Sequence, residues 1–361
     1  MRLAVISRLA ALAVIAGAMA ACAQNPHDVR VNVGTGYIKT KKDKATDFAA
    51  LYLSYARMAT VAYTDDDYLQ KEDRPYCPDR KSIHDAIKKG VAKADALRAT
   101  LKHVEMLERE GWRCTFGNTR PLPCQPPRSG CYGIAGLQYH AWRRLRGGGC
   151  TEVAIAFRGT DIDQIGDWVS NVRWFNRLLP LRDQYDQVAD NIEGITHRVR
   201  MEGCRNAQVV SVGHSLGGGL AQYAAFNDES IRYVYAFDPS PVTAFLAVAR
   251  DEREKMRKHL GIDRVNETGE ILVGLRFVAG GFVNPQACNP FVRMVRFNIT
   301  SWEGMISQHN MNQLTERFEN IAPTDLHERE KLARGVRAVS VAQNCVWAPE
   351  IWLDREPGRT F

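Results

Sequence analysis

Several familiar signatures are missing from this chain, and each absence removes a class of function. The nine cysteines form no Cys-x-x-Cys pair and no His-Glu-x-x-His occurs, so we expect no metal site. No basic stripe interleaved with aromatic residues occurs, which argues against a nucleic-acid partner. Internal repeats and long low-complexity tracts are also missing. What is left is an ordinary globular composition for 361 residues, 45% hydrophobic and 25% charged.

The first residues have the pattern of an export signal. Arg2 and Arg8 give a basic start, an apolar run extends from Leu9 to Ala16, and small residues lead to Cys22. This apolar run is too short for a membrane-spanning helix. Residues 1–21 are therefore predicted to be a signal peptide.

The signal has two possible cleavage sites. Met19-Ala20-Ala21-Cys22 resembles a bacterial lipobox, which would make Cys22 a lipidated first residue, with the following alanine indicating the outer membrane. Alternatively, Ala21-Cys22-Ala23 fits an ordinary A-x-A site with cleavage before Gln24. We favour the lipobox, so we expect a bacterial cell-envelope protein, either an outer membrane lipoprotein or periplasmic. A lipid anchor at the N-terminus would then be its contact with the membrane.

The other eight cysteines are an even number, which suits an oxidising compartment. Cys150 lies just before the apolar run 152–157, and Cys204 lies just before the apolar run 208–212. If these runs are adjacent parallel strands, both cysteines lie at the same end of the sheet. We therefore predict a Cys150–Cys204 disulfide. Cys288–Cys345 is the next candidate, and the remaining pairings stay open.

The hydrophobic pattern alternates between strands and helices from residue 137 onward. Strands are expected at 137–145, 152–157, 208–212, 231–237 and 292–299, and helices at about 47–59, 82–110, 183–202, 216–228, 241–260 and 310–320. This alternation predicts an α/β fold with a mostly parallel sheet and helices on both faces. We expect a linker at 22–45, one domain at 46–345 with a Cys/Pro-rich insertion near 64–136, and a tail at 346–361.

The most informative motif follows the valine-rich run 208–212. Gly213-His214-Ser215-Leu216-Gly217 stands between this expected strand and an expected helix. Gly-x-Ser-x-Gly in that context is the signature of a nucleophile elbow, a tight turn that holds the serine hydroxyl above the sheet. The helix N-terminus would favour the oxyanion that forms during acyl transfer. Ser215 is therefore the predicted nucleophile.

A second motif comes before the elbow. Phe157-Arg158-Gly159-Thr160-Asp161 ends the earlier strand, and Asp167-Trp168-Val169-Ser170-Asn171 follows. In this order and spacing, the two motifs and the elbow resemble the class 3 lipase family, the fungal triacylglycerol lipase-like α/β-hydrolases, over residues 137–320. The resemblance implies an α/β-hydrolase fold that needs no metal or organic cofactor. It also implies that the backbone N–H groups of Thr160 and Leu216 bind the oxyanion.

The base and the acid must come later in the chain, because an α/β-hydrolase orders its triad as Ser, then Asp or Glu, then His. His309 follows the last expected strand after a short loop, where the family places its histidine. The family's acid position falls on Glu270, with Glu in place of the usual Asp. Because of this departure, Asp238 and Asp263 stay open as alternatives, in that order.

A possible lid lies beside the expected oxyanion turn. The segment 168–179 contains Trp168, Trp174 and Phe175, and the equivalent region of class 3 lipases is a mobile amphipathic cover. An apolar surface there would suit an acyl chain or a membrane interface. Simple packing of these side chains on the sheet is an equal alternative.

These observations predict a serine hydrolase that cleaves carboxylic esters of lipids through an acyl-enzyme. Phospholipase A acting on membrane phospholipids and short-chain carboxylesterase stay open, and the mild net charge of +7 leans slightly toward phospholipid. A catalytically silent envelope lipoprotein, serving as a binding or scaffold module on the same fold, is the alternative from another class. A peptidase is a third possibility.

Overall fold

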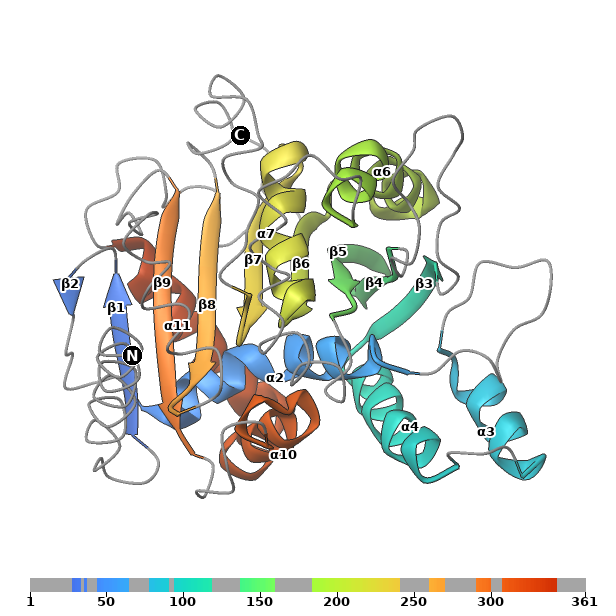
Figure 1. The fold of residues 1–361 in the computed structure, drawn as a ribbon, viewed down its shortest axis with the longest axis horizontal. Helices are drawn as coiled ribbons and strands as arrows, with labels where there is room; N and C mark the ends of the chain where they lie inside the picture. The colour runs from blue at the N-terminus through green and yellow to red at the C-terminus, as the bar shows by residue number, and fades with distance from the viewer. Residues whose placement is uncertain are drawn as a thin grey trace, which may run out of the picture.

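The computed structural model describes residues 28–33, 36–37, 44–64, 78–90, 94–118, 137–159, 184–240, 260–269, 290–299 and 307–342. Their strands form one sheet in the order β2-β1-β9-β8-β7-β6-β5-β4-β3 (Figure 1). The strands are β1 (Asp28–Val33), β2 (Gly36–Tyr37), β3 (Trp112–Asn118), β4 (Tyr139–Arg146), β5 (Gly149–Phe157), β6 (Gln208–His214), β7 (Ile231–Phe237), β8 (Gly261–Glu267) and β9 (Phe291–Asn298).

The sheet is mixed rather than mostly parallel. The central strands β5 to β9 run parallel to one another, whereas β1, β2, β3 and β4 pair antiparallel at the two edges. Gly147 and Gly148, both with positive φ (54° and 80°), join β4 to β5. A two-residue turn of this kind makes a hairpin, so β4 must run against β5. The predicted mostly parallel arrangement therefore holds only for the centre.

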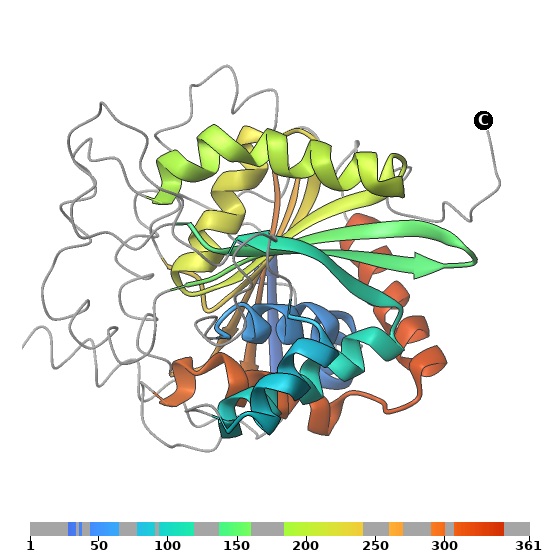
Figure 2. The same cartoon turned by 90° about the vertical axis from the view of Figure 1, so that its right-hand side faces the viewer.

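Helices cover both faces of the sheet, as predicted (Figure 2). One face carries α6 (Gln184–Val199) and α7 (Leu216–Asn227), and π-helical residues Arg200–Cys204 follow α6. The other face carries α2 (Ala45–Val61), α4 (Ala94–Arg109), α10 (Met311–Ile321) and α11 (Leu326–Ala342), with α3 (Arg80–Lys88) beside α4. Each face has its own apolar core. The described residues thus form an α/β protein.

The central strands supply both cores by alternation. In β7, Tyr233, Tyr235 and Phe237 pack in the core on the α2 face, while Val234 and Ala236 pack in the core beside α7. Strands buried on both faces read as continuous apolar runs, which is why the sequence pattern found them. Among the described helices, none combines the length and apolarity that a membrane span requires.

The predicted Cys150–Cys204 disulfide is confirmed. It joins the start of β5 to the end of the π-helical segment before β6, with a Cα–Cα distance of 5.1 Å. Cys114 in β3 is also disulfide-bonded. The candidate Cys288–Cys345 pair lies outside the described residues, as do the signal at 1–21 with Cys22, residues 241–259 of the helix expected at 241–260 and the tail at 346–361.

Candidate active site

The backbone at Ser215 is strained in the way a nucleophile elbow requires. Ser215 lies between β6 and α7 with φ 56° and ψ −123°, a conformation that residues with a side chain rarely adopt. Its N–H donates to the carbonyl of Phe237 (3.0 Å), and its own carbonyl accepts from the N–H of Ser240 (2.9 Å). These bonds pin the turn to the end of β7. Ser215 as a whole is only 5% exposed.

The glycines of the motif are required by close backbone contacts. A Cβ on Gly213 would lie 2.1 Å from the carbonyl oxygen of Gly217. A Cβ on Gly217 would lie 2.4 Å from the carbonyl oxygen of Phe157 and 3.0 Å from the nitrogen of Gly159. The end of β5 is therefore pressed against the elbow. This contact brings the backbone at Gly159, the residue just before Thr160, to the first turn of α7.

Leu216 is the first residue of α7. The N–H groups in the first turn of a helix have no partner within the helix, and the helix dipole makes this end partly positive. Leu216, which the family resemblance predicts to be an oxyanion donor, therefore has its N–H in the first turn of a helix. Thr160, the other predicted donor, lies outside the described residues.

Three buried side chains gather beside the elbow. His214, Asp238 and His309 each offer one nitrogen or oxygen atom, and these atoms all lie within 4.8 Å of one another. The two imidazole centroids are 4.7 Å apart. His214 ends β6, Asp238 follows β7, and His309 ends a short 3-10 helix, Ser307–His309, just before α10. The fold thus brings together residues from three separated segments at the carboxyl end of the sheet.

Asp238 is held in position by its backbone as well as by its carboxylate. Its φ is 37°, its N–H donates to the carbonyl of Val265 (2.7 Å), and its Oδ1 accepts from the N–H of Glu267 (3.0 Å). Asp238 as a whole is 1% exposed. Since Phe237 and Ser240, on either side of it, both bond the backbone of Ser215, Asp238 is locked next to the elbow.

Asp263, another of the predicted alternative acids, has a different role in the packing. Its carboxylate forms a buried ion pair with Arg293 and accepts hydrogen bonds from the hydroxyls of Tyr52 (2.8 Å) and Tyr233 (2.7 Å). Burial raises the pKa of both tyrosines well above 10, and the Asp263 charge raises them further. Asp263 therefore links α2 and β9 to β8. It lies within β8 and not at the carboxyl end of the strand.

Sequence reasoning did not single out His214 or Tyr63. Nδ1 of His214 and the hydroxyl of Tyr63 are 2.8 Å apart. Tyr63 follows α2, far from the elbow in sequence, so no local pattern could indicate this contact. His214, by contrast, lies inside the Gly-x-Ser-x-Gly motif. A titratable imidazole directly before the predicted nucleophile was a signal that the sequence did offer. Glu270 and the lid candidates Trp168, Trp174 and Phe175 lie outside the described residues.

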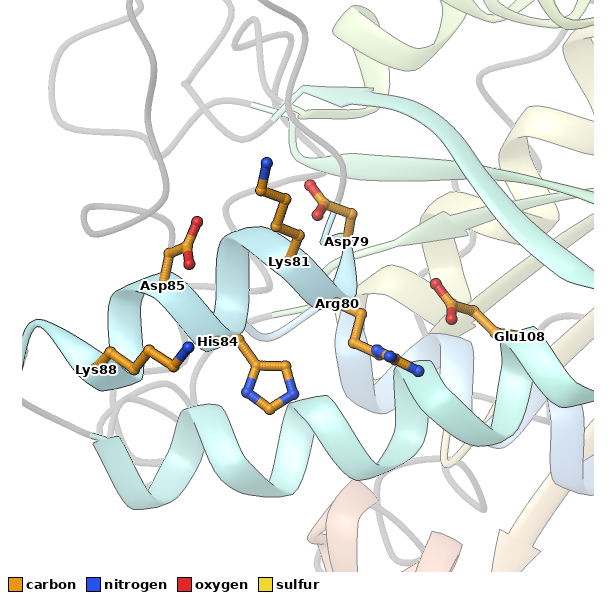
Figure 3. Close-up of a pocket in the computed structure, with 7 residues that line it drawn as sticks. All are labelled: Asp79, Arg80, Lys81, His84, Asp85, Lys88 and Glu108. Carbon is orange, nitrogen blue, oxygen red and sulfur yellow. The ribbon is translucent and has the colours of Figure 1, made fainter.

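A hollow of about 610 Å³ lies elsewhere, on α3 and α4 (Figure 3). Both acidic and basic side chains line it. The lining residues are Asp79, Arg80, Lys81, His84, Asp85, Lys88 and Glu108. Neither Ser215 nor any member of the histidine–aspartate cluster is among these residues. The chemistry at the elbow therefore takes precedence over this open surface feature as the candidate active site.

The described residues define an α/β protein with a strained serine between strand and helix, beside two histidines and a carboxylate. Over residues 125–237 the chain matches a family model described as Phospholipase-like: Tle-like phospholipase domain. The matched range contains β4 to β7 and the elbow. It supports a lipid-hydrolysing enzyme of a lipase or phospholipase family, without singling out the class 3 lipases. Comparisons with curated proteins and with solved structures found no match.

Proposed function

We propose that this protein is an exported serine hydrolase that cleaves the carboxylic esters of phospholipids, in the manner of a phospholipase A. The observation that carries the proposal is the strained Ser215 at the elbow, within the range matched by the phospholipase-like family model. Such strain is kept only where the surrounding structure enforces it, and it gathers at functional sites. An envelope location, inferred from the signal and from Cys22, would place the enzyme beside its substrate.

In the proposed mechanism, Ser215 attacks the ester carbonyl and His309 takes the proton from its hydroxyl. His309 then returns the proton to the leaving alcohol, and water releases the fatty acid from the acyl-enzyme. The backbone N–H groups of Leu216 and Thr160 stabilise the oxyanion. The position of Leu216 at the start of α7 and the contact of the β5 end with Gly217 support these two roles.

Asp238 is our choice for the acid that orients His309. Its carboxylate and a nitrogen of His309 belong to the group of atoms within 4.8 Å of one another. Asp263 is already engaged by Arg293 and two tyrosines. Glu270 is the choice that follows from the family resemblance, so the two carboxylates need a direct comparison.

The proposed function is tested by covalent labelling of the purified protein with a fluorophosphonate probe. We expect labelling of wild type, loss of labelling in Ser215→Ala, and full labelling in the neighbouring control Ser240→Ala, whose backbone N–H bond to Ser215 is kept. A wild-type protein that takes no label would support the silent scaffold instead.

Substrate class is tested separately on purified enzyme that has not been treated with the probe. Release of fatty acid is measured from phosphatidylglycerol vesicles, from emulsified triglyceride and from a short p-nitrophenyl ester. We expect the phospholipid to give the highest kcat/KM, with all activity lost in Ser215→Ala. Preference for triglyceride would make the protein a lipase, and preference for the short ester would make it a carboxylesterase.

A further inference from the structure

We propose that His214, Asp238 and His309 together bind one transition-metal ion, Zn²⁺ in the first instance, and that this ion reversibly inhibits the enzyme. The three side chains place two nitrogens and one oxygen within 4.8 Å of one another, and all three are buried. Ligand atoms on a tetrahedral zinc lie roughly 3.3–3.5 Å apart, as zinc–ligand distances of about 2.0–2.2 Å require. A contraction of at most about 1.5 Å therefore closes the cluster around an ion.

The chemistry of these ligands selects the kind of metal. Two imidazoles and one carboxylate suit Zn²⁺ and other first-row transition metals, whereas Mg²⁺ and Ca²⁺ prefer oxygen ligands. Three protein ligands leave a fourth position that water can fill. The ligands come from β6, from the residue after β7 and from the residues before α10. Because they are dispersed in this way, they form no metal-binding motif in the sequence.

Tyr63 gives His214 the support that a metal-binding histidine needs. Its hydroxyl lies 2.8 Å from Nδ1 of His214 and also donates to the carbonyl oxygen of His214 (3.4 Å). When the tyrosine hydrogen is directed to that carbonyl, the hydroxyl oxygen accepts from Nδ1–H, which leaves the lone pair on Nε2. Nε2 is itself buried. A second-shell hydrogen bond of this kind fixes the ring and its tautomer for a metal.

Inhibition follows because the ion would occupy a nitrogen of His309 and the carboxylate of Asp238, which the proposed mechanism needs as base and acid. This consequence rests on the proposed function, whereas binding of the ion does not. An opening that admits an ester to Ser215 also admits a hydrated ion, so no separate entry path is required. Chelation of the ion frees His309 again, and the inhibition is therefore reversible.

The experiment is calorimetric titration of chelator-treated protein with ZnCl₂, together with zinc inhibition of p-nitrophenyl ester hydrolysis. We expect one ion per chain, and activity that falls as the site fills and returns with EDTA. Ser215→Ala should bind zinc as wild type does, since the hydroxyl is not a ligand. His214→Gln should weaken binding at least 10-fold. Tyr63→Phe leaves the ligands in place and should also weaken binding, since loss of a second-shell partner typically costs 10–100-fold.

His84→Gln is the matched control, because His84 is an exposed histidine on α3 in the charged hollow. It should bind zinc with unchanged affinity. The inference is overturned if wild type binds no zinc, if His214→Gln binds as tightly as wild type, or if His84→Gln abolishes binding. Ester hydrolysis without zinc binding would sink this inference alone. Zinc binding without fluorophosphonate labelling would sink the proposed function and leave the metal site standing.

Discussion

Backbone strain in the described residues marks the same place as the side-chain chemistry. Only two non-glycine residues among them have positive φ, Ser215 (56°) and Asp238 (37°). Each conformation of this kind costs roughly 1–3 kcal/mol and persists only where the neighbouring structure enforces it. The hydrogen bonds that join Ser215 to Phe237 and Ser240 enforce both at once. Ser215 and Asp238 are separated in sequence but are neighbours in the fold. Their shared strain therefore supports a common role in one site.

The strongest prediction at the residue scale concerns the acid of the triad. Asp238→Asn should lower kcat by roughly 10³–10⁴-fold, because His309 loses the charge that orients it. Asparagine tolerates positive φ and keeps the oxygen that accepts from Glu267, so the fold should survive. Ester hydrolysis and thermal unfolding are measured on the same preparations.

Glu270→Gln serves as the comparison variant for that measurement. With Asp238 as the acid, Glu270→Gln should retain activity within a few-fold of wild type. The opposite pattern, an inactive Glu270→Gln beside an active Asp238→Asn, would return the acid to the position that the family resemblance selects.

Individual site residues could be predicted from the sequence only where the evidence for them lies within a short stretch of chain. Ser215 and its glycines form one continuous motif, so strand, turn and helix could be predicted together. The contact of His214 with Tyr63 joins residues 151 positions apart, and no local pattern encodes it. Asp238 was one of three carboxylates with suitable chain order. Its proximity to His309, and the ion pair that already engages Asp263, distinguish the two only in the structure.

At the scale of elements, the position of α10 depends on a charged contact with the neighbouring helices. Glu319 of α10 forms ion pairs with Arg57 of α2 (3.0 Å) and Lys102 of α4 (2.7 Å), and His103 lies 3.5 Å away. Burial raises the pKa of Glu319, but hydrogen bonds from His103 and Lys102 and the charge of Arg57 outweigh it and hold the pKa below its usual range. Since His309 lies just before α10, a contact that holds α10 in place also helps to hold His309 in the candidate site.

Glu319→Gln should therefore destabilise the protein by about 2 kcal/mol at pH 7, because buried Arg57 loses a charged partner. A carboxyl with a lowered folded pKa gives stability that is complete above its unfolded pKa, near 4.5, and is lost as pH falls further. The gap between variant and wild type should thus narrow below about pH 4.5. Urea unfolding at pH 7 and pH 3.5 measures it.

Exposed Glu316, one turn earlier on α10, provides the control. Glu316→Gln should change stability by no more than about 0.5 kcal/mol at either pH. A gap for Glu319→Gln that stays constant, or widens, as pH falls would show that the charge of Glu319 is not what stabilises this junction.

Element boundaries show where the periodic pattern was sufficient and where it was not. The expected helix 82–110 is two helices, α3 and α4, because Gly90 with φ 67° ends the first of them. Within the stretch expected to be a linker, Asp28–Val33 forms β1, which pairs with β9. Its alternating apolar pattern is that of a half-buried strand, but its partner lies more than 250 residues away. That pairing was not available from local sequence.

Across the whole molecule, the candidate site and the confirmed disulfide lie at opposite ends of the same strands. Cys150 and Cys204 join the starting ends of β5 and β6, while Ser215 follows the far end of β6, roughly 20 Å away along the strand. The central parallel order could be predicted because each strand is followed by a helix or a long crossover. It places Ser215 and the His214, Asp238 and His309 cluster at the carboxyl end of the sheet.

This separation predicts that stability and chemistry can be changed independently. The disulfide spans 54 residues of sequence, and loss of such a cross-link should cost about 4 kcal/mol, because the unfolded chain gains freedom. The double variant Cys150→Ser/Cys204→Ser should therefore unfold at lower urea concentration. Its fluorophosphonate labelling of Ser215 under native conditions should match wild type, because the elbow is held by Phe237 and Ser240. Loss of labelling in a variant that is still folded would mean that the cross-link positions the elbow through β6.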